Sequence, residues 1–161
     1  MGFTLHYHPM ASFAMKVTVG LYEIDFAFES SAGEIAVMGD ATLLGELVRN
    51  LVDNAFKYTP RGGSVVLAVC SEPSRIMVDD SGPGVAEADR ERVFAPFSRV
   101  AQLDTTSGAP IPGTGLGLAI VREVAQAHGA TVNIVTSPME GARFVVSFES
   151  AARQSTVSPA L

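Results

Sequence analysis

The chain has 161 residues, 47% of them hydrophobic and 17% charged, which suits a single folded domain and excludes global disorder. Eleven Lys and Arg against 17 Asp and Glu give a net charge of −6, which argues against a large nucleic-acid surface but not against a nucleotide. One cysteine, no apolar run of membrane-spanning length and no signal-peptide pattern predict a soluble, intracellular-type domain.

Three regions are expected along the chain. Residues 1–14 lack clean periodicity and are interpreted as a vector-derived or linker leader; their His6 and His8 have no third ligand nearby for a metal site. Residues 15–149 would form the domain itself. Residues 150–161 are polar and rich in small side chains, and we expect them to be a flexible tail.

Strands are predicted where apolar residues alternate: one or two over 15–28, one over 34–38, a pair over 65–70 and 75–78, and a final hairpin of 131–136 and 142–148. A helix is predicted from the N-cap Asp40 to about Tyr58, followed by the stop signals Pro60, Gly62 and Gly63. Its apolar stripe has three- and four-residue spacing and comprises Leu43, Leu44, Leu47, Val48, Leu51, Val52, Ala55 and Phe56.

The stretch 79–112 is rich in loop-forming residues and contains only a short predicted helix near 87–94. A second long helix opens at 113–117 and ends near His128, with Gly129 as its left-handed C-cap. Its predicted inner face comprises Leu118, Ile120, Val121, Val124 and Ala125. The fold class is therefore α+β: a two-layer sandwich with a mixed, mostly antiparallel sheet of about five strands and about three helices on one face.

Three clusters of residues could carry chemistry. Asn50, Asn54 and Lys57 share one face of the first helix, although by themselves they could equally form a solvated polar face. The segment 79–85 (Asp-Asp-Ser-Gly-Pro-Gly-Val) follows a strand with a tight turn, where a ligand can approach the backbone and an aspartate can accept a hydrogen bond from an exocyclic amine; an ordinary strand-end turn is the alternative.

The third cluster, residues 113–118 (Gly-Thr-Gly-Leu-Gly-Leu), opens a helix. Bare backbone N–H groups at a helix N-terminus, favoured by the helix dipole, form a phosphate site. The glycine spacing matches neither the dinucleotide-binding fingerprint nor a P-loop, so those two nucleotide folds are excluded.

In this order the motifs resemble those of the ATP-binding catalytic domain of bacterial two-component sensor histidine kinases, in the GHKL superfamily. Residues 50–58 resemble the N box, 80–84 the G1 box, 94–99 the F box (Phe-Ala-Pro-Phe-Ser-Arg) and 113–118 the G2 box. The resemblance extends over about residues 21–148, and four ordered motifs are far more specific than a lone glycine pattern.

The resemblance implies ATP and Mg²⁺ as ligands, with Asn54, helped by Asn50, holding the metal. It implies phosphate contacts from Lys57 and from the backbone of Gly113, Gly115 and Gly117. It implies an adenine contact from Asp80, close approach of the base at Gly82 and Gly84, and further nucleotide contacts from Tyr58, Val85, Thr114, Leu116 and Leu118. Arg99 would reach the γ-phosphate during transfer and so act as a catalytic residue with Asn54, and residues 98–112 would form a lid over ATP.

Two features are absent from this pattern. The related gyrase, mismatch-repair and chaperone ATPases carry a water-activating glutamate where this chain has Asn50, so poor hydrolysis of ATP is expected. The family's dimerisation helix pair with its phosphoacceptor His-Glu motif is not found in the sequence, and His128 has the position of a helix-end residue near the C-terminal dipole. We therefore expect a largely monomeric piece of a larger kinase.

The resemblance also implies partners and a location: the phosphoacceptor helices of the parent kinase, indirectly a response regulator, no nucleic acid, and a cytoplasmic position below an inner-membrane anchor. Phe94 and Phe97 could dock on those helices or belong to the core. Three alternatives are a free-standing serine kinase of the anti-sigma-factor type, a non-catalytic nucleotide-sensing module, and an ATP-driven clamp. The F-box segment and the long lid favour the sensor kinase.

Overall fold

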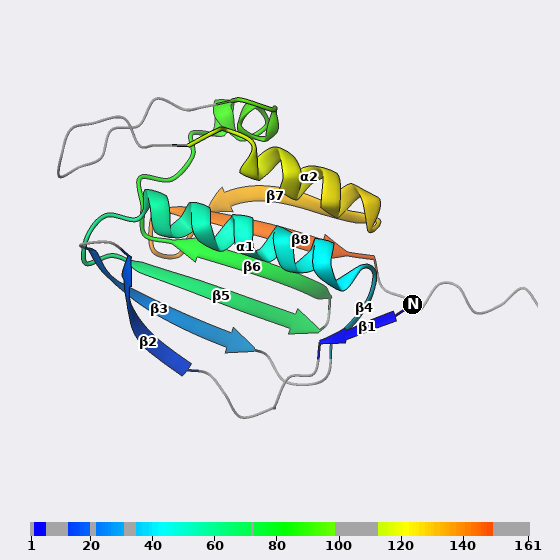
Figure 1. Cartoon of the computed structure of the whole chain (residues 1–161). Coiled ribbons are helices and arrows are strands. Elements are labelled where there is room, and N and C mark those ends of the chain that lie inside the picture. The colour runs from blue at the N-terminus through cyan, green and yellow to red at the C-terminus, as the bar shows by residue number, and fades with distance from the viewer. Residues whose placement is uncertain are drawn as a thin grey trace, which may run out of the picture.

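The computed structural model describes residues 2–5, 13–19, 22–30, 35–71, 73–98 and 113–149 (Figure 1). Within these ranges the elements are β1 (Gly2–Leu5), β2 (Phe13–Val19), β3 (Tyr22–Ser30), β4 (Ile35–Met38), α1 (Ala41–Tyr58), β5 (Ser64–Ser71), β6 (Ser74–Asp80), the 3₁₀ turns η1 (Glu87–Asp89) and η2 (Arg92–Phe94), α2 (Gly117–Ala127), β7 (Ala130–Thr136) and β8 (Ala142–Phe148). None of the helices in this part of the chain has the length and apolar character needed to cross a bilayer.

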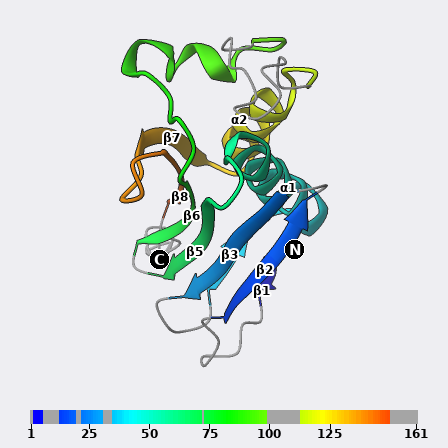
Figure 2. The same ribbon diagram turned by 90° about the vertical axis from the view of Figure 1, so that its left-hand side faces the viewer.

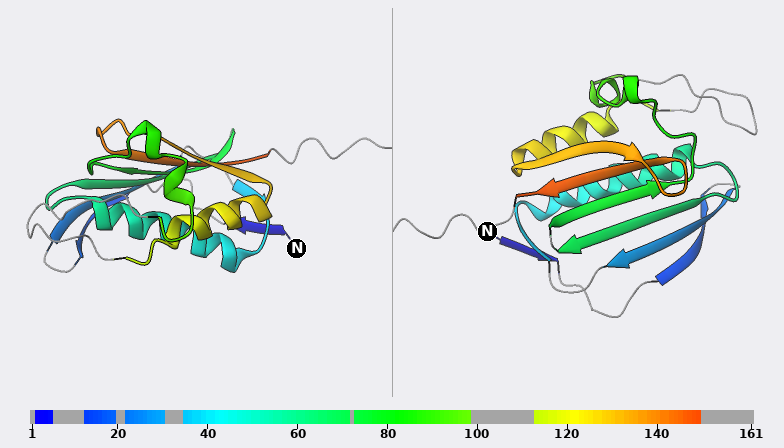
Figure 3. Two further views of the ribbon diagram at one scale, coloured as in Figure 1. Left: turned by 90° about the horizontal axis from the view of Figure 1, so that it is seen from above. Right: turned by 180° about the vertical axis from the view of Figure 1, so that it is seen from behind.

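The main sheet has six strands in the order β2-β3-β5-β6-β8-β7. The β3–β5 pair is parallel and the other four pairs are antiparallel, while β1 and β4 form a separate antiparallel pair. Both α-helices lie on one face of the sheet (Figures 1 and 3). The predicted α+β fold with a mixed, mostly antiparallel sheet is thus confirmed. Strand β1 and the start of β2 lie within residues 1–14, where the sequence predicted no regular element.

Helix α1 forms as the sequence predicts, because a good N-cap precedes an apolar stripe. The Oδ1 atom of Asp40 accepts hydrogen bonds from the backbone N–H groups of Thr42 (2.8 Å) and Leu43 (3.0 Å). Leu47 and Leu51 are completely buried, and each fully buried Leu contributes about 1.5–3 kcal/mol. Leu43 belongs to the predicted stripe but is 44% exposed, whereas the next residue, Leu44, is buried, because successive residues of a helix point about 100° apart.

Helix α2 begins at Gly117, and its C-terminal glycine, Gly129, has the predicted left-handed conformation with φ of 63°. Val121 is fully buried against the core. Ile120 was wrongly placed on the inner face: it is 42% exposed, because successive residues of a helix point about 100° apart and Val121 takes the inward direction.

The predicted short helix near 87–94 is also corrected, because this segment forms the two 3₁₀ turns η1 and η2 rather than one α-helix. Arg90 donates one hydrogen bond to the carbonyl of Val85 in the preceding turn (3.3 Å) and another to the Oγ1 atom of Thr136 (3.2 Å), and the second bond holds the segment to the β7–β8 hairpin. Figure 2 shows the segment beside α2, at the end of the molecule away from β2 and β3.

His128 connects the C-terminus of α2 to the N-terminus of α1. Its Nε2 atom accepts a hydrogen bond from the backbone N–H of Asp40 (3.0 Å), so the ring proton sits on Nδ1, which donates to the carbonyl of Val124 (2.7 Å). A Cβ atom at Gly39 would collide with the ring. The residue that the sequence placed near the helix dipole therefore acts as a specific link between the two helices.

Replacing His128 with Ala should lower the free energy of unfolding by about 1–3 kcal/mol, because two hydrogen bonds are lost and the N–H of Asp40 loses its acceptor. Urea unfolding followed by circular dichroism measures this loss. His128→Asn is the informative companion variant, since it keeps one donor and one acceptor. An unfolding midpoint unchanged in His128→Ala would contradict this role.

Candidate functional site

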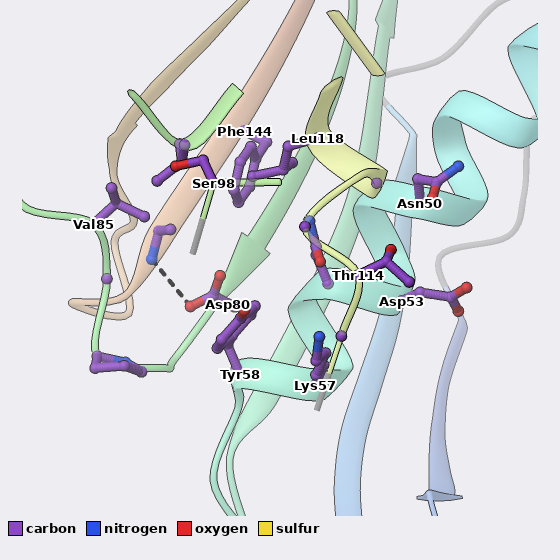
Figure 4. A pocket seen from close by; sticks show the side chains of 18 residues that line it. Asn50, Asp53, Lys57, Tyr58, Asp80, Val85, Ser98, Thr114, Leu118 and Phe144 are labelled. Atoms are coloured by element: carbon purple, nitrogen blue, oxygen red, sulfur yellow. Dashed lines mark hydrogen bonds between the residues drawn. The ribbon is translucent and has the colours of Figure 1, made fainter. Parts of the chain in front are cut away.

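A pocket of about 380 Å³ opens between the C-terminal half of α1, the N-terminus of α2 and the turn that follows β6 (Figure 4). This volume lies within the range of small-molecule sites. Its lining includes twelve of the residues that the sequence singled out: Asn50, Asn54, Lys57, Tyr58, Asp80, Gly84, Val85, Gly113, Thr114, Gly115, Gly117 and Leu118. Three motifs that are far apart in sequence therefore meet in one cavity.

Three of the candidate residues lie elsewhere. Gly82 and Leu116 are next to the pocket but not among its lining residues. Gly82 lies in the turn after β6, and Leu116 is the N-cap of α2. Arg99, with the rest of the expected lid at 99–112, lies outside the described residues.

The polar face of α1 forms one wall of the pocket. The Nδ2 atom of Asn50 donates a hydrogen bond to the carbonyl of Glu46 (2.8 Å), which turns its Oδ1 atom toward the start of α2. A Cβ atom at Gly117 would lie 3.1 Å from this oxygen. The Nζ atom of Lys57 lies 5.3 Å from the ring centre of Tyr58, and both side chains line the same cavity. An amide oxygen and a cation thus face the space in front of α2.

Asp80 lies at the opposite end of the pocket and is only 4% exposed. Its Oδ1 atom accepts hydrogen bonds from the backbone N–H groups of Gly82 (2.9 Å) and Ala142 (3.0 Å), neither of which uses Oδ2. Burial raises the pKa of Asp80 above its ordinary value of 3.8; the two backbone hydrogen bonds act in the opposite direction, and the neighbouring charge of Asp79 adds to the increase. Within the described part of the chain the carboxyl is therefore anchored through Oδ1, and Oδ2 is the oxygen that remains for a ligand.

The turn after Asp80 passes too close to neighbouring backbone for any residue but glycine. A Cβ atom at Gly82 would lie 2.7 Å from the carbonyl oxygen of Tyr58, and one at Gly141 would collide with Asp80 itself. Gly84 adopts a φ of 71°, which side chains rarely tolerate. These glycines bring the end of α1, the turn and the β7–β8 loop together around the carboxyl.

Asp79, the neighbour of Asp80, has a different role. Side chains alternate along a strand, so Asp79 points away from the pocket. Its carboxylate forms a two-pronged ion pair with Arg143 on β8, with distances of 2.6 and 2.8 Å. The strand register places these two residues opposite each other. Of two consecutive aspartates, one therefore stabilises the sheet and the other faces the cavity.

The glycine loop of residues 113–117 forms the wall opposite Asn50. Gly115 has a φ of 71°, and its carbonyl accepts a hydrogen bond from the backbone N–H of Phe97 (3.0 Å). No described side chain caps the N-terminus of α2, so the N–H groups of its first turn remain for a ligand. With the helix dipole they favour an anion at this position.

The structure adds lining residues that the sequence analysis did not name as site residues: Asp53, Pro83, Val93, Ser98, Ala142 and Phe144. Of these, Asp53, Pro83 and Ser98 lie within the predicted segments 50–58, 79–85 and 94–99. Ala142 and Phe144 belong to β8 and reach the pocket only because β8 pairs with β6. No local pattern could reveal them. Asp53 did have a signal, since it lies three residues after Asn50 on the same side of α1.

The two phenylalanines of the F-box segment have opposite environments. Phe94 is 3% exposed and belongs to the core, so of its two predicted roles the core role is correct. Phe97 is 73% exposed and has a φ of 61°, which is rare for a residue other than glycine.

No group of three or more His, Cys, Asp and Glu side chains suited to a metal ion occurs among the described residues. On the α1 wall of the pocket, the asparagine amides and Asp53 offer oxygens to a cation. A hard cation such as Mg²⁺ binds oxygen ligands and completes its shell with water and phosphate oxygens. The donor set therefore fits Mg²⁺ that arrives with a polyphosphate, and it does not fit a metal held by the protein alone.

Residues 39–152 match the family model described as histidine kinase-, DNA gyrase B-, and HSP90-like ATPase. The chain is 40% identical over 113 residues, 68% of its length, to the signal transduction histidine-protein kinase/phosphatase MprB of Mycolicibacterium vanbaalenii, and 39% identical over 109 residues to the sensor protein RstB of Escherichia coli. It spans about a fifth to a quarter of these relatives, 22% and 24% respectively.

Solved structures agree with this family match. The mycobacterial sensor histidine kinase MprB has a TM-score of 0.64 at 31% identity, over 76% of this chain and 80% of that one. The catalytic domain of histidine kinase ThkA has a TM-score of 0.65 at 29% identity, over 78% and 79%.

Proposed function

The chain belongs to the family of histidine kinase-, DNA gyrase B-, and HSP90-like ATPases, and from this we propose that it binds Mg-ATP and donates the γ-phosphoryl group to a histidine of a sensor kinase. The observation that carries the proposal is the convergence of Asp80, the polar face of α1 and the open N-terminus of α2 on one pocket. An amine acceptor at one end and anion-binding groups at the other match the two ends of ATP.

Asp80 would select the base. Its Oδ2 atom would accept a hydrogen bond from the amino group of adenine, while Oδ1 stays bound to the backbone of Gly82 and Ala142. GTP carries a carbonyl oxygen at the corresponding position, which the carboxylate would repel. The base would lie beside Gly84 and Val85 and against Phe144, all of which line this part of the pocket.

The phosphates would extend toward Lys57 and the first turn of α2, with Gly113, Gly115 and Gly117 supplying backbone N–H donors. Asn54 and Asn50 would hold Mg²⁺, and the metal would neutralise the negative charge that develops on the phosphates. Thr114, Leu116 and Leu118 would complete the contacts, and Tyr58 would cover the sugar side of the pocket.

Transfer to a histidine, rather than to water, agrees with the identity of residue 50. An amide cannot act as a general base, so Asn50 would leave water inactive, and hydrolysis should be slow. A histidine ring nitrogen would instead attack the γ-phosphorus while the bond to the β–γ bridging oxygen breaks and ADP leaves. Arg99 would stabilise the charge on the transferred group.

The acceptor histidine would lie on a dimerisation helix pair of the parent kinase, and a response regulator would receive the phosphoryl group next. The relatives are named as sensor proteins and signal transduction kinases, which supports this assignment. We propose a cytoplasmic position for the domain, below a membrane anchor of the parent protein, and a monomeric state for the domain by itself. Exposed Phe97 would contact the acceptor helices.

The test follows γ-labelled Mg-ATP through binding, phosphate release and transfer. The chain should retain label as bound ATP with negligible release, and transfer it once a sensor-kinase dimerisation helix pair bearing the acceptor histidine is added. Acid-labile label on that helix pair supports a phosphohistidine. Sustained phosphate release without transfer would favour an ATPase clamp, and acid-stable label on a serine would favour the anti-sigma-factor type of kinase.

Replacing Arg99 with Ala should leave the dissociation constant of Mg-ATP within about threefold of wild type and slow transfer by about 10²–10³-fold, because the arginine acts on transition-state charge. Equilibrium binding and single-turnover transfer, measured on the same preparation, separate these effects. Loss of binding in parallel with transfer would instead make Arg99 a ligand of the ground state.

A further inference from the structure

Arg122 joins helix α2 to the segment of residues 91–98 by two different contacts. Its guanidinium carbon lies 4.4 Å from the ring centre of Phe94, within the range of a cation–π interaction. Its Nη2 atom lies 2.7 Å from the Oε2 atom of Glu91. The side chain of Arg122 is 30% exposed, whereas that of Glu91 is 85% exposed, so the stack on Phe94 is the better shielded of the two contacts.

The segment held in this way forms part of the pocket. Val93, the neighbour of Phe94, is buried and lines the cavity, and Ser98 lines the cavity as well. A second attachment comes from the backbone N–H of Phe97, which donates to the carbonyl of Gly115. The segment is therefore attached at two points to α2 and the glycine loop that precedes it. One point is Gly115 in the glycine loop, and the other is Arg122, beyond the first turn of the helix.

We propose that Arg122 is a positioning residue for phosphoryl transfer, which it serves by holding the segment 91–98 in place against the helix that binds the phosphates. This inference rests on the proposed function. Arg122 does not line the pocket, so it acts through Phe94 and Glu91. The segment leads directly into Arg99, the proposed catalytic residue, and a displacement of about 1 Å at a reacting group can slow a reaction by about 100-fold.

Arg122, Phe94 and Glu91 do not themselves line the pocket, although Val93 and Ser98 of the same segment do. Arg122 contacts Phe94 and Glu91. The groups that would bind the two ends of ATP lie on other elements: Asp80, Asn54 and the glycine loop. Loss of the contact should therefore affect transfer far more than affinity. A merely structural role would lower stability and affinity together.

The test compares Arg122→Met, which keeps the aliphatic stem, with Arg122→Lys, which keeps the charge but not the planar guanidinium. Arg122→Met should slow single-turnover transfer from Mg-ATP to the acceptor helix pair by about 10- to 100-fold. Its dissociation constant for Mg-ATP should stay within about threefold of wild type. Arg122→Lys should recover part of the transfer rate. Glu91→Gln should transfer at close to the wild-type rate, because an exposed ion pair contributes little to holding the segment.

Arg92→Met is the matched control, since it removes a guanidinium of the same segment that forms its ion pair with Asp89 of η1 and not with a residue of α2. It should transfer at the wild-type rate. Hydrogen exchange of the free chain gives a readout that needs no acceptor: amides of residues 92–98 should exchange faster in Arg122→Met, with those of α1 and β5 unchanged.

The outcomes separate this proposal from the proposed function. A wild-type chain that transfers to no acceptor refutes the function, and the exchange measurement still decides whether Arg122 holds the segment. An Arg122→Met variant with wild-type transfer and wild-type exchange overturns the positioning role. So does a variant whose transfer falls only in proportion to its lost affinity or folded fraction.

Discussion

Asp80→Asn should weaken the binding of ATP by roughly ten- to a hundredfold, because it would remove the proposed charge-assisted hydrogen bond to the base, of about 1.5–3 kcal/mol. The two bonds from Gly82 and Ala142 to Oδ1 can persist, since the amide oxygen of asparagine can also accept both of them. The shape of the pocket is thereby kept while its selectivity changes. Titration with ATP and with GTP measures the change in affinity and in selectivity. The substitution should reduce the affinity for GTP less than the affinity for ATP.

The same substitution should stabilise the ligand-free domain. Burial raises the pKa of Asp80, so the folded chain binds this proton more tightly than the unfolded chain does. The contribution of Asp80 to stability is therefore greatest below its ordinary pKa of 3.8 and declines as pH rises through the raised, folded-state pKa. An asparagine side chain has no proton to lose, so the stability advantage of Asp80→Asn should grow across this window and then level off.

Urea unfolding of both chains at several pH values tests this pH dependence. Asp25→Asn is a suitable control, since Asp25 is an exposed carboxyl on β3, away from the pocket. The difference in unfolding free energy between the wild type and Asp80→Asn should vary with pH. A constant difference would show that Asp80 ionises as freely in the folded chain as in the unfolded chain. Unchanged discrimination between ATP and GTP would contradict its role in base selection.

Asn54→Ala should abolish the Mg²⁺-dependent part of ATP binding, an effect of about a hundredfold for the loss of about 3 kcal/mol of charge-assisted contact. Asn54 lies on the face of α1 that lines the pocket, and alanine favours a helix interior more than asparagine does. The fold should therefore remain intact, with equal or greater helix stability. Calorimetry with ATP in Mg²⁺ and in EDTA gives the measurement: the variant should show the same weak affinity in both.

Asn133→Ala is the matched control, because Asn133 is an exposed asparagine of β7 that does not line the pocket. It should bind Mg-ATP as the wild type does. If Asn54→Ala retained the full difference between Mg²⁺ and EDTA, the metal would be held by other groups, and Asn50 with Asp53 would become the candidates.

Local sequence was sufficient for the parts of the site that lie on a single element. The spacing of Asn50, Asn54 and Lys57 determines that they share one face of α1, because a helix repeats about every 3.6 residues. The cap at Asp40 and the glycine at position 129 set helix ends in the same way, through short-range hydrogen bonds and backbone conformation. Most strands followed equally from alternation of apolar residues.

Only the tertiary structure decided which elements meet. Strand order and the crossing of two helices depend on packing between residues far apart in sequence, which no local pattern encodes. The β6–β8 pairing brings Ala142 to the carboxyl of Asp80, His128 links the two helices, and Arg122 covers Phe94. The burial that raises the pKa of Asp80 arises in the same way, because solvent is excluded only when these separate elements close around it.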